Sequence, residues 1–451
     1  MTNKEKYELL AEGDSGLASI MAILPYSKEQ DLSPDYIKQA LKNNKDFKFI
    51  SFSKSDDEDY SYISSHIAEL EYLGVPYSVD IHVANTEYLN VEDYSFANHI
   101  DNRSLEAAKE QTQYVETSLF FNEDNLASFH LQMKVMNAII PNASVVIDFM
   151  SYRLFSAQWL SMSAKSQVPP SPDYLYTMHC VYDQETSNGE KKYWFHTHGL
   201  HRCGAVELEM LNITQSIEQM HTLLNMTVKK FLTDPAKEKE KFVIGYDGMG
   251  INLCWLRWEE ALNDFPAKIL GGIDDRSEED NIHAAPSGVI FAVEDKNMIS
   301  PEIYGPTLAD NPIYYISTDE TNRMSALAKE RFGMFKEVFE KENPWRDKKK
   351  SLIKNIFGSK KQDESQWAFL VKLGLEVDNN ETGNEKEHLW FEALSIDGDE
   401  IEAKLLNQPY WIASLKEGEI YKYKTDVLTD WIIYGPETTY TTDSIYQLGF
   451  S

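Results

Sequence analysis

Short runs of apolar residues separated by polar ones organise the first hundred positions of the chain. Residues 19–25 form a continuous apolar run that is typical of a buried strand. Residues 33–44 have a helical period, with Ser33 at the N-cap and Pro34 at the first helical position. Apolar residues then alternate with polar ones on both sides of Gly74, which predicts an antiparallel hairpin.

The same mixture of strands and helices continues to about residue 340. Residues 174–183 and 191–199 read as two strands joined by a Ser187-Asn188-Gly189 turn, and Ala205–Leu211 as a further strand. Apolar residues spaced three or four apart predict an amphipathic helix that ends near Phe231. Residues 321–343 predict one long helix.

A lysine-rich segment then interrupts an otherwise acidic chain. Residues 341–366 are polar and basic, and they predict a linker between domains. Residues 367–451 contain short alternating segments divided by turn residues, which favours a small sheet or barrel.

These patterns predict an α+β protein of several domains, with mixed or antiparallel sheets, packed helices and a small β-rich C-terminal domain. We expect an α+β portion at 1–100, a second at 101–340, the linker at 341–366 and the β-rich domain at 367–451. Whether residues 1–340 form one domain or two stays open.

Composition and charge restrict the class of protein. The 451 residues carry a formal charge of −30, which disfavours nucleic acid and anionic membrane surfaces, since both attract clustered Lys and Arg. Three cysteines cannot build a disulfide framework, and the odd number fits a reducing compartment. The start of the chain does not read as a signal peptide, and no apolar run is long enough to span a bilayer. We therefore expect a cytoplasmic protein without nucleic-acid or membrane partners.

The stretch Tyr193–Gly204, YWFHTHGLHRCG, holds the densest candidate chemistry. On a strand, His196 and His198 point to the same face, as two ligands of one ion would. Possible further ligands and binding groups follow within eleven residues: His201, Cys203, Glu207 and Glu209. The metal set that the spacing indicates is His196, His198 and Cys203, and zinc would accept such nitrogen and sulfur donors.

A structural interpretation of the same stretch also stays open, and the sequence favours it. Zinc sites usually draw ligand pairs from separated segments, whereas these residues are crowded into one. Alternating His, Thr and Tyr residues suit a half-buried strand whose imidazoles bond to backbone carbonyls. His179 and Cys180 lie across the predicted turn, so they can neighbour the same face. No cofactor is predicted from the sequence, with zinc as the alternative.

The tail resembles a small uncharacterised bacterial domain, the YegJ-like domain. The resemblance rests on a strand containing Trp390, two glycine turns, an Asn-x-Pro step and an Asp-Trp ending; the matching residues are Trp390, Gly398, Asn407, Pro409, Lys416, Gly418, Asp430 and Trp431. The preceding region, with its HTHGL and ELE segments, is similar to the long N-terminal part that some bacterial proteins join to this tail. The resemblance implies a bacterial protein of unknown function and transfers no catalytic residue.

The functional expectation is a non-enzymatic interaction protein with an immunity-like or stress-related role and a protein partner, basic in view of the charge of −30. The alternative is a metal-binding protein or metal-dependent hydrolase centred on the HTHGLHRC segment. A catalytic constellation is not complete in the sequence, so an enzyme is the less favoured of the two.

Overall fold

A computed structural model of the chain describes residues 2–11, 17–55, 61–94, 100–183, 191–245, 250–277, 281–310, 318–342, 367–378 and 385–449. The chain divides into two compact units, and each is described by itself. Unit 1 comprises residues 1–165 and 169–315, and unit 2 comprises residues 166–168 and 316–451.

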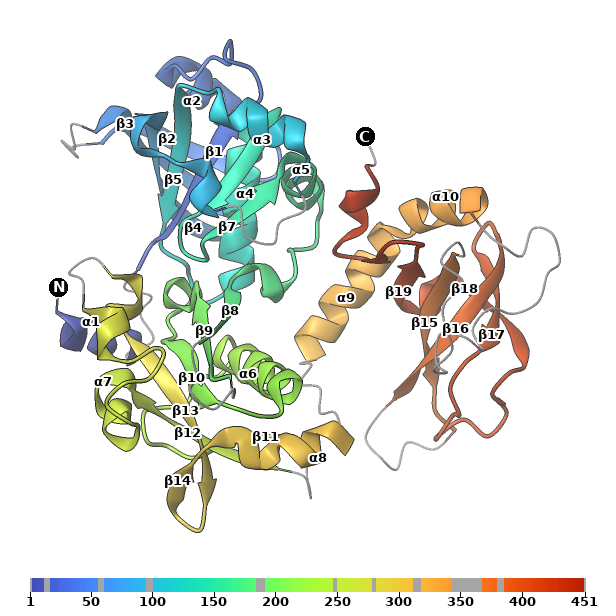
Figure 1. Cartoon of the computed structure of the whole chain (residues 1–451). Coiled ribbons are helices and arrows are strands. Elements are labelled where there is room, and N and C mark those ends of the chain that lie inside the picture. The colour runs from blue at the N-terminus through green and yellow to red at the C-terminus, as the bar shows by residue number, and fades with distance from the viewer. Residues whose placement is uncertain are drawn as a thin grey trace. The chain divides into compact units, whose positions relative to one another are not determined.

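The first sheet of unit 1 has seven strands in the order β2-β3-β4-β5-β1-β6-β7 (Figure 1). Every pairing in it is antiparallel. Gly74, at φ 83°, forms the turn of the β3–β4 hairpin, as the alternation predicts. Its strands are β1 (Ser19–Pro25), β2 (Lys48–Lys54), β3 (Tyr62–Tyr72), β4 (Val75–Asn85), β5 (Gln113–Leu119), β6 (Ala143–Asp148) and β7 (Arg153–Ser156).

Helices pack on both faces of this first sheet. Ala108 of α3 lies in one apolar cluster with Ala22 and Leu24, and Gln132 of α4 bonds to Ser19 on the opposite face of β1. Ser33 caps α2 by accepting from the Tyr36 N–H, so the predicted helix start is confirmed. The helices are α2 (Pro34–Asn43), α3 (Asn102–Lys109), α4 (Asn125–Ile139) and α5 (Ala157–Lys165).

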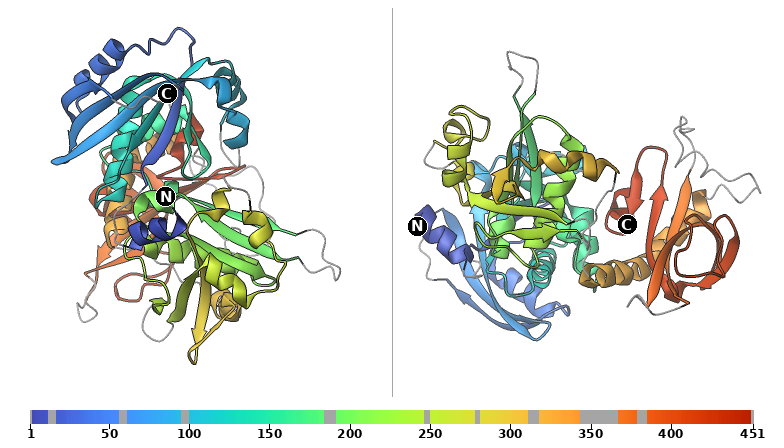
Figure 2. Two further views of the ribbon diagram at one scale, coloured as in Figure 1. Left: turned by 90° about the vertical axis from the view of Figure 1, so that its left-hand side faces the viewer. Right: turned by 90° about the horizontal axis from the view of Figure 1, so that it is seen from below.

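The second sheet of unit 1 has the order β11-β12-β13-β10-β9-β8, with β14 on β13 (Figure 1). Its green and yellow strands are seen from two further sides in Figure 2. It is mixed, because β10 and β13 run parallel while the other pairs are antiparallel. Its strands are β8 (Thr177–Tyr182), β9 (Tyr193–His198), β10 (Glu207–Ile213), β11 (Phe242–Ile244), β12 (Ile251–Arg257), β13 (Ser287–Glu294) and β14 (Asn297–Ile299).

The two faces of the second sheet carry different elements. The Phe195 ring points toward His221 of α6, whereas Trp194 belongs to an apolar cluster with Leu256 and Phe291 on the other face. The α1 residue Tyr7 donates to the Ser287 carbonyl at the start of β13. The helices of this region are α1 (Asn3–Ala11), α6 (Ile217–Phe231), α7 (Trp258–Ala261) and α8 (Gly305–Asp310).

Unit 2 is a six-stranded antiparallel sheet, β18-β17-β16-β15-β19-β20, with two helices against it. The Phe335 ring of α10 lies edge-on to Phe369 and tilted against Trp431, so the helices cover an aromatic face of the sheet. The elements are α9 (Thr318–Glu330), α10 (Phe332–Glu342), β15 (Ala368–Glu376), β16 (Lys386–Asp397), β17 (Glu400–Leu405), β18 (Ile420–Lys424), β19 (Leu428–Tyr434) and β20 (Thr439–Thr441).

The multidomain α+β class is confirmed, but the boundaries of its parts differ from expectation. The portions 1–100 and 101–340 do not coincide with the sheets, because β4 pairs with β5 across residue 100. The two C-terminal helices belong with the tail sheet rather than with the portion before the linker. The Ser187–Gly189 turn and residues 343–366 of the expected linker lie outside the described residues.

The single helix expected at residues 321–343 is two helices. The chain turns at Arg331, whose buried guanidinium donates to the Thr442 carbonyl at 2.6 Å. Gly333, a weak helix former, follows within the first turn of α10. Among the described residues, the helices are all too short or too polar to cross a lipid bilayer.

Candidate functional site

The histidine-rich stretch forms the end of β9 and a 3-10 turn, η4 (Leu200–Cys203), before β10. Trp194, His196 and His198 share one face of the strand, as the period of two predicts. His196 is 3% exposed and His198 is 6% exposed, so both imidazoles are inside the protein. Gly199 makes the turn at φ 114°, where an added Cβ would lie 2.3 Å from the Leu175 carbonyl oxygen.

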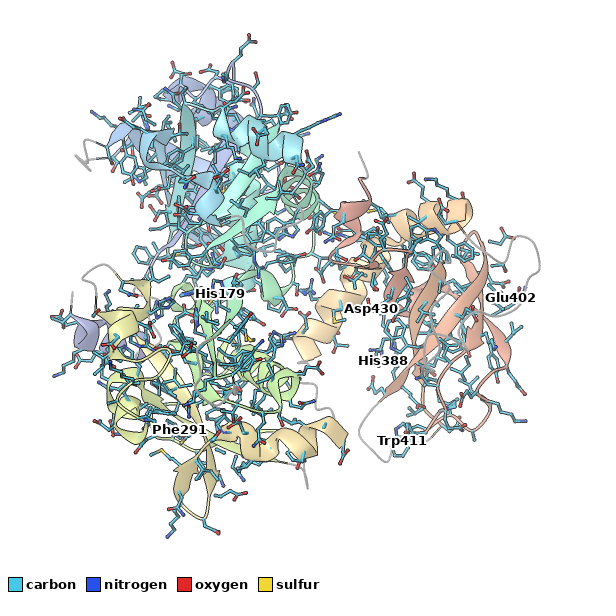
Figure 3. All side chains as sticks on the ribbon, in the orientation of Figure 1. His179, Phe291, His388, Glu402, Trp411 and Asp430 are labelled. Carbon is cyan, nitrogen blue, oxygen red and sulfur yellow. The ribbon has the colours of Figure 1, made fainter. Side chains whose placement is uncertain are left out.

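A third histidine joins this pair from β8. His179 is the direct cross-strand partner of His196, and it lies half-buried at the edge of the sheet (Figure 3). Its ring centroid is 5.2 Å from that of His196 and 5.1 Å from that of His198. One ligand atom from each of the three residues lies within 4.8 Å of the others, a spacing suited to a metal ion.

A fourth histidine borders the cluster from a distant part of the chain. His283 lies in η7 (Ile282–Ala284), with its ring centroid 4.7 Å from His196 and 5.3 Å from His198. The backbone N–H of His283 donates to the Asn281 side chain, and the backbone carbonyl of His283 accepts from Arg276. The sequence offers no signal for this residue, because η7 follows a polar loop with no periodic pattern.

The environment keeps these imidazoles neutral. Burial lowers the pKa of His196 and His198 well below the ordinary value, and the neighbouring histidines lower it further. Burial is also the main cause of the lowered pKa of His179 and His283. A neutral imidazole has a free electron pair on one nitrogen, which is the form that binds a metal ion.

Two buried ring nitrogens of the cluster lack a hydrogen-bond partner in the described part of the chain. They are Nδ1 of His196 and Nε2 of His198. A buried polar atom left without a partner costs about 1–3 kcal/mol, so native structures rarely keep one without a reason. The expected structural interpretation, imidazoles bonded to backbone carbonyls, does not describe these two nitrogens.

The other residues singled out from the sequence have different roles. His201 bonds through Nε2 to the Pro286 carbonyl at 2.7 Å. Cys203 is not part of the cluster, and desolvation raises its pKa to about 12, so the thiol stays protonated. Of the expected set His196, His198 and Cys203, the structure brings the two histidines together with His179 and leaves Cys203 outside this group.

The two glutamates are engaged in other contacts. Glu207 accepts from the backbone N–H groups of Gly199 and Leu200 at 2.8 and 2.9 Å, and from Thr197 Oγ1 at 2.7 Å. It therefore fixes the turn that follows β9. Glu209 forms a paired contact with Arg276 at 2.6 and 3.0 Å and accepts from Trp194 Nε1 at 2.8 Å. Both carboxylates shape the site without facing it as ligands.

A buried ion pair ties the site to the first sheet. The Arg202 guanidinium, fully buried, donates to both carboxylate oxygens of Asp148 at 3.0 and 2.7 Å and to the Leu175 carbonyl at 2.6 Å. Asp148 ends β6, and the Ser151 hydroxyl and N–H also donate to it. This contact holds the β6–β7 turn, which carries Tyr152, next to the histidine strand.

The residues behind the YegJ-like resemblance are structural. Trp431 is fully buried, and its indole N–H donates to the Ala328 carbonyl of α9. Asn407 accepts from the Trp390 N–H at 2.8 Å, and Gly398 and Gly418 adopt positive φ angles at turns. Asp430 is buried, and burial raises its pKa to about 6. These residues specify the fold of the domain.

Comparison with known families matches the three sheets in turn. A family model described as the N-terminal part of a protein of unknown function (DUF4026) matches residues 19–170, and the C-terminal part of the same family matches residues 178–291. The chain belongs to the DUF4026 family. A third model, an uncharacterized protein conserved in bacteria (DUF2314), matches residues 320–448.

The expected membership of uncharacterised bacterial families is therefore confirmed. No curated protein and no solved structure matches the chain. The first sheet lies in the region matched by the N-terminal DUF4026 model, whereas His196, His198 and His283 lie in the region matched by the C-terminal model. The function of these families is unknown, so a function must be argued from the residues themselves.

Proposed function

We propose that this DUF4026 protein binds a divalent transition-metal ion through His179, His196 and His198. The observation that carries the proposal is the convergence of three imidazoles, with ligand atoms within 4.8 Å of one another. Imidazole nitrogens suit Zn²⁺, Cu²⁺ and Ni²⁺. Nitrogens bound to one zinc ion at about 2.0–2.1 Å lie about 3.3 Å apart, so small side-chain rotations complete the site.

The two ring nitrogens without a hydrogen-bond partner give a physical reason for a ligand. An ion would bind electron pairs that otherwise lie buried without a partner on His196 and His198. The rigid β8–β9 pairing holds two of the three donors, His179 and His196, directly opposite one another. Donors on paired strands lose little freedom when an ion binds, which favours affinity. Of the two sequence interpretations, the geometry favours the metal-binding alternative.

Elemental analysis of the purified protein tests the proposal. The wild type should retain about one zinc, copper or nickel ion per chain, and His196→Ala and His198→Ala should lose it. His221→Ala is the matched control, because His221 is exposed on α6 and belongs to the opposite face of the sheet. Equal ion content in the wild type and His196→Ala would contradict the proposal.

A second candidate function, binding of a protein partner, has support in unit 2. Tyr410 and Trp411 are 84% and 47% exposed, yet their backbone N–H groups are held by the buried Glu387 carboxylate at 2.8 and 3.0 Å (Figure 3). Rigid, exposed aromatic residues are common anchors of protein interfaces. A partner that binds the wild type and not Tyr410→Ala/Trp411→Ala would support this role, and equal binding to both would contradict it.

The expected cytoplasmic location remains part of the proposal. Cys180, Cys203 and Cys254 are free thiols, and Cys180 is exposed. A reducing compartment preserves such thiols. Fractionation of the native cell, with the protein found outside the cytoplasmic fraction, would contradict this location.

A further inference from the structure

The proposed ion would carry an uncompensated charge. This inference rests on the proposed function, because it concerns the ion that the three histidines would hold. Imidazole donors are neutral, and the carboxylates of Glu207 and Glu209 are engaged elsewhere. A divalent ion bound there would keep both positive charges. Sites with three protein donors also leave a position for an external ligand, and this charge favours an anion in it.

A phenol lies beside one of the three histidines. Tyr152 lies in the turn between β6 and β7, and its ring centroid is 5.0 Å from that of His198. Its backbone is in the left-handed region, at φ 52°. For a bulky residue this conformation costs about 1–3 kcal/mol, and such strain concentrates at functional sites. The turn is held in place by Asp148, which accepts from Ser151 and binds Arg202.

A cation follows the phenol in sequence. The Arg153 guanidinium donates to the Tyr176 carbonyl at 3.0 Å and to the Asp173 carbonyl at 3.2 Å. Tyr176 directly precedes Thr177, the cross-strand partner of His198. Arg153 therefore lies beside the end of the histidine strands.

Within the described ranges, no carboxylate lies at ion-pair distance from this arginine; the nearest compensating charge is that of Asp148, its cross-strand partner, which is already paired with Arg202. Two of the five N–H donors of Arg153 bond to carbonyls, and Phe155 and Tyr174 lie 5.8 and 6.0 Å from its central carbon. The carbonyls and rings fix the guanidinium without cancelling its charge. Arginine held in this way suits recognition of a carboxylate or another oxyanion.

We propose that the metal ion held by His179, His196 and His198 binds a small carboxylate, which the Tyr152 hydroxyl and the Arg153 guanidinium recognise. The ion accepts one carboxylate oxygen. The phenol O–H and the guanidinium N–H groups donate to the carboxylate from the β6–β7 turn. The ligand thus joins residues of the first sheet to residues of the second.

The test uses the full-length protein loaded with Co²⁺, whose visible absorption changes when an external ligand binds. Acetate is the probe, and acetamide is its neutral counterpart of similar shape. In the wild type, acetate should change the spectrum and acetamide should not. Arg153→Leu should raise the half-saturating acetate concentration about tenfold, and Tyr152→Phe about fivefold. Arg103→Leu, an exposed arginine on α3, should stay within about twofold of the wild type.

Co²⁺ affinity, measured for each variant without acetate, separates the two proposals. A wild type that binds no Co²⁺ contradicts the proposed function and this inference with it. A wild type that binds Co²⁺ without any spectral response to acetate overturns the inference alone. Wild-type acetate affinity in both Tyr152→Phe and Arg153→Leu would also overturn it. Tyr152→Phe removes one hydroxyl, so it decides the matter if Arg153→Leu does not fold.

Discussion

His179 on β8 lies directly opposite His196 on β9, with their ring centroids 5.2 Å apart. The pairing of the two strands, rather than closeness in sequence, brings the third candidate donor to the HTH pair. Two strand neighbours and one cross-strand neighbour form a compact set of donors on one face of a sheet. This arrangement is the basis of the metal-binding proposal.

Metal binding should stabilise unit 1. Zn²⁺ at about 100 times its dissociation constant should raise the free energy of unfolding by about 2.7 kcal/mol, because only the folded state assembles the three histidines. Thermal unfolding with Zn²⁺ or with a chelator measures this difference. Mg²⁺ is the control ion, since it prefers oxygen ligands and should not shift the midpoint. An equal shift in His196→Ala would refute the assignment of the site.

His196 and His283 should differ in their effects on Zn²⁺ affinity. His196→Ala removes a donor from the centre of the cluster and should weaken Zn²⁺ binding about 100-fold or more. His283→Ala removes a neighbour outside the closest set and should weaken it about tenfold, as an outer contact does. Competition with a chelating dye measures both constants. The reverse order of effects would show that His283, and not His196, is the main donor.

The Arg202–Asp148 pair should be essential for the stability of unit 1. Both side chains are fully buried, so Arg202→Met leaves the Asp148 carboxylate without its cation and should cost about 3–5 kcal/mol. Arg257→Met is the matched control, because the Arg257 side chain is 37% exposed in its pair with Glu238 and the loss should be about 1 kcal/mol or less. Urea unfolding compares the two variants. Equal losses in the free energy of unfolding would show that the buried Arg202–Asp148 pair matters no more than the partly exposed one.

The double variant Arg202→Met/Asp148→Asn sharpens this test. Removal of both charges takes away the unpaired carboxylate, so the double variant should lose less stability than the sum of the two single variants. Additive losses would show that the two residues do not act as a pair.

Asp430 should make the stability of unit 2 depend on pH. Burial raises its pKa to about 6 in the folded state, against about 3.9 in an unfolded chain. The folded state therefore binds the proton more tightly, and the free energy of unfolding should fall as pH rises from about 4 to about 6. The total change from this group is about 3 kcal/mol.

Asp430→Asn removes the group that titrates, so its free energy of unfolding should lack this decline relative to the wild type. Asp426→Asn is the control, because Asp426 lies in the nearby turn η12 (Thr425–Val427) and is exposed. Denaturation at several pH values compares the three proteins. The same decline in Asp430→Asn as in the wild type would assign the effect to another group.

Local patterns were enough to predict most elements of the fold and three of the four clustered histidines. The alternation in residues 193–198 places His196 and His198 on one face, and the predicted hairpin brings His179 beside them. His283 was not predicted, because the turn that carries it comes about 85 residues after His198 in the sequence. Glu207 and Glu209 have the spacing of ligands, but their bonds to the turn and to Arg276 appear only in three dimensions.

The first sheet crosses the expected boundary at residue 100 for a similar reason. The local sequence pattern predicts that a segment is a strand, but the strands that pair with it can come from distant segments of the chain. The β1 strand pairs with β5 and β6, so the first sheet continues to residue 156, past the expected boundary at 100. The residues behind the YegJ-like resemblance are informative for the tail because they include turn and core positions, and Trp431 is the clearest case.

Isothermal titration calorimetry of the chelator-treated wild type with Zn²⁺ is the most direct test of metal binding by the three histidines. We expect about one tight site per chain, its loss in His196→Ala/His198→Ala, and an unchanged site in His221→Ala, with far-ultraviolet circular dichroism showing that all three proteins are folded. A folded wild type without a tight Zn²⁺, Cu²⁺ or Ni²⁺ site, or a double variant that binds as the wild type does, would contradict the proposal.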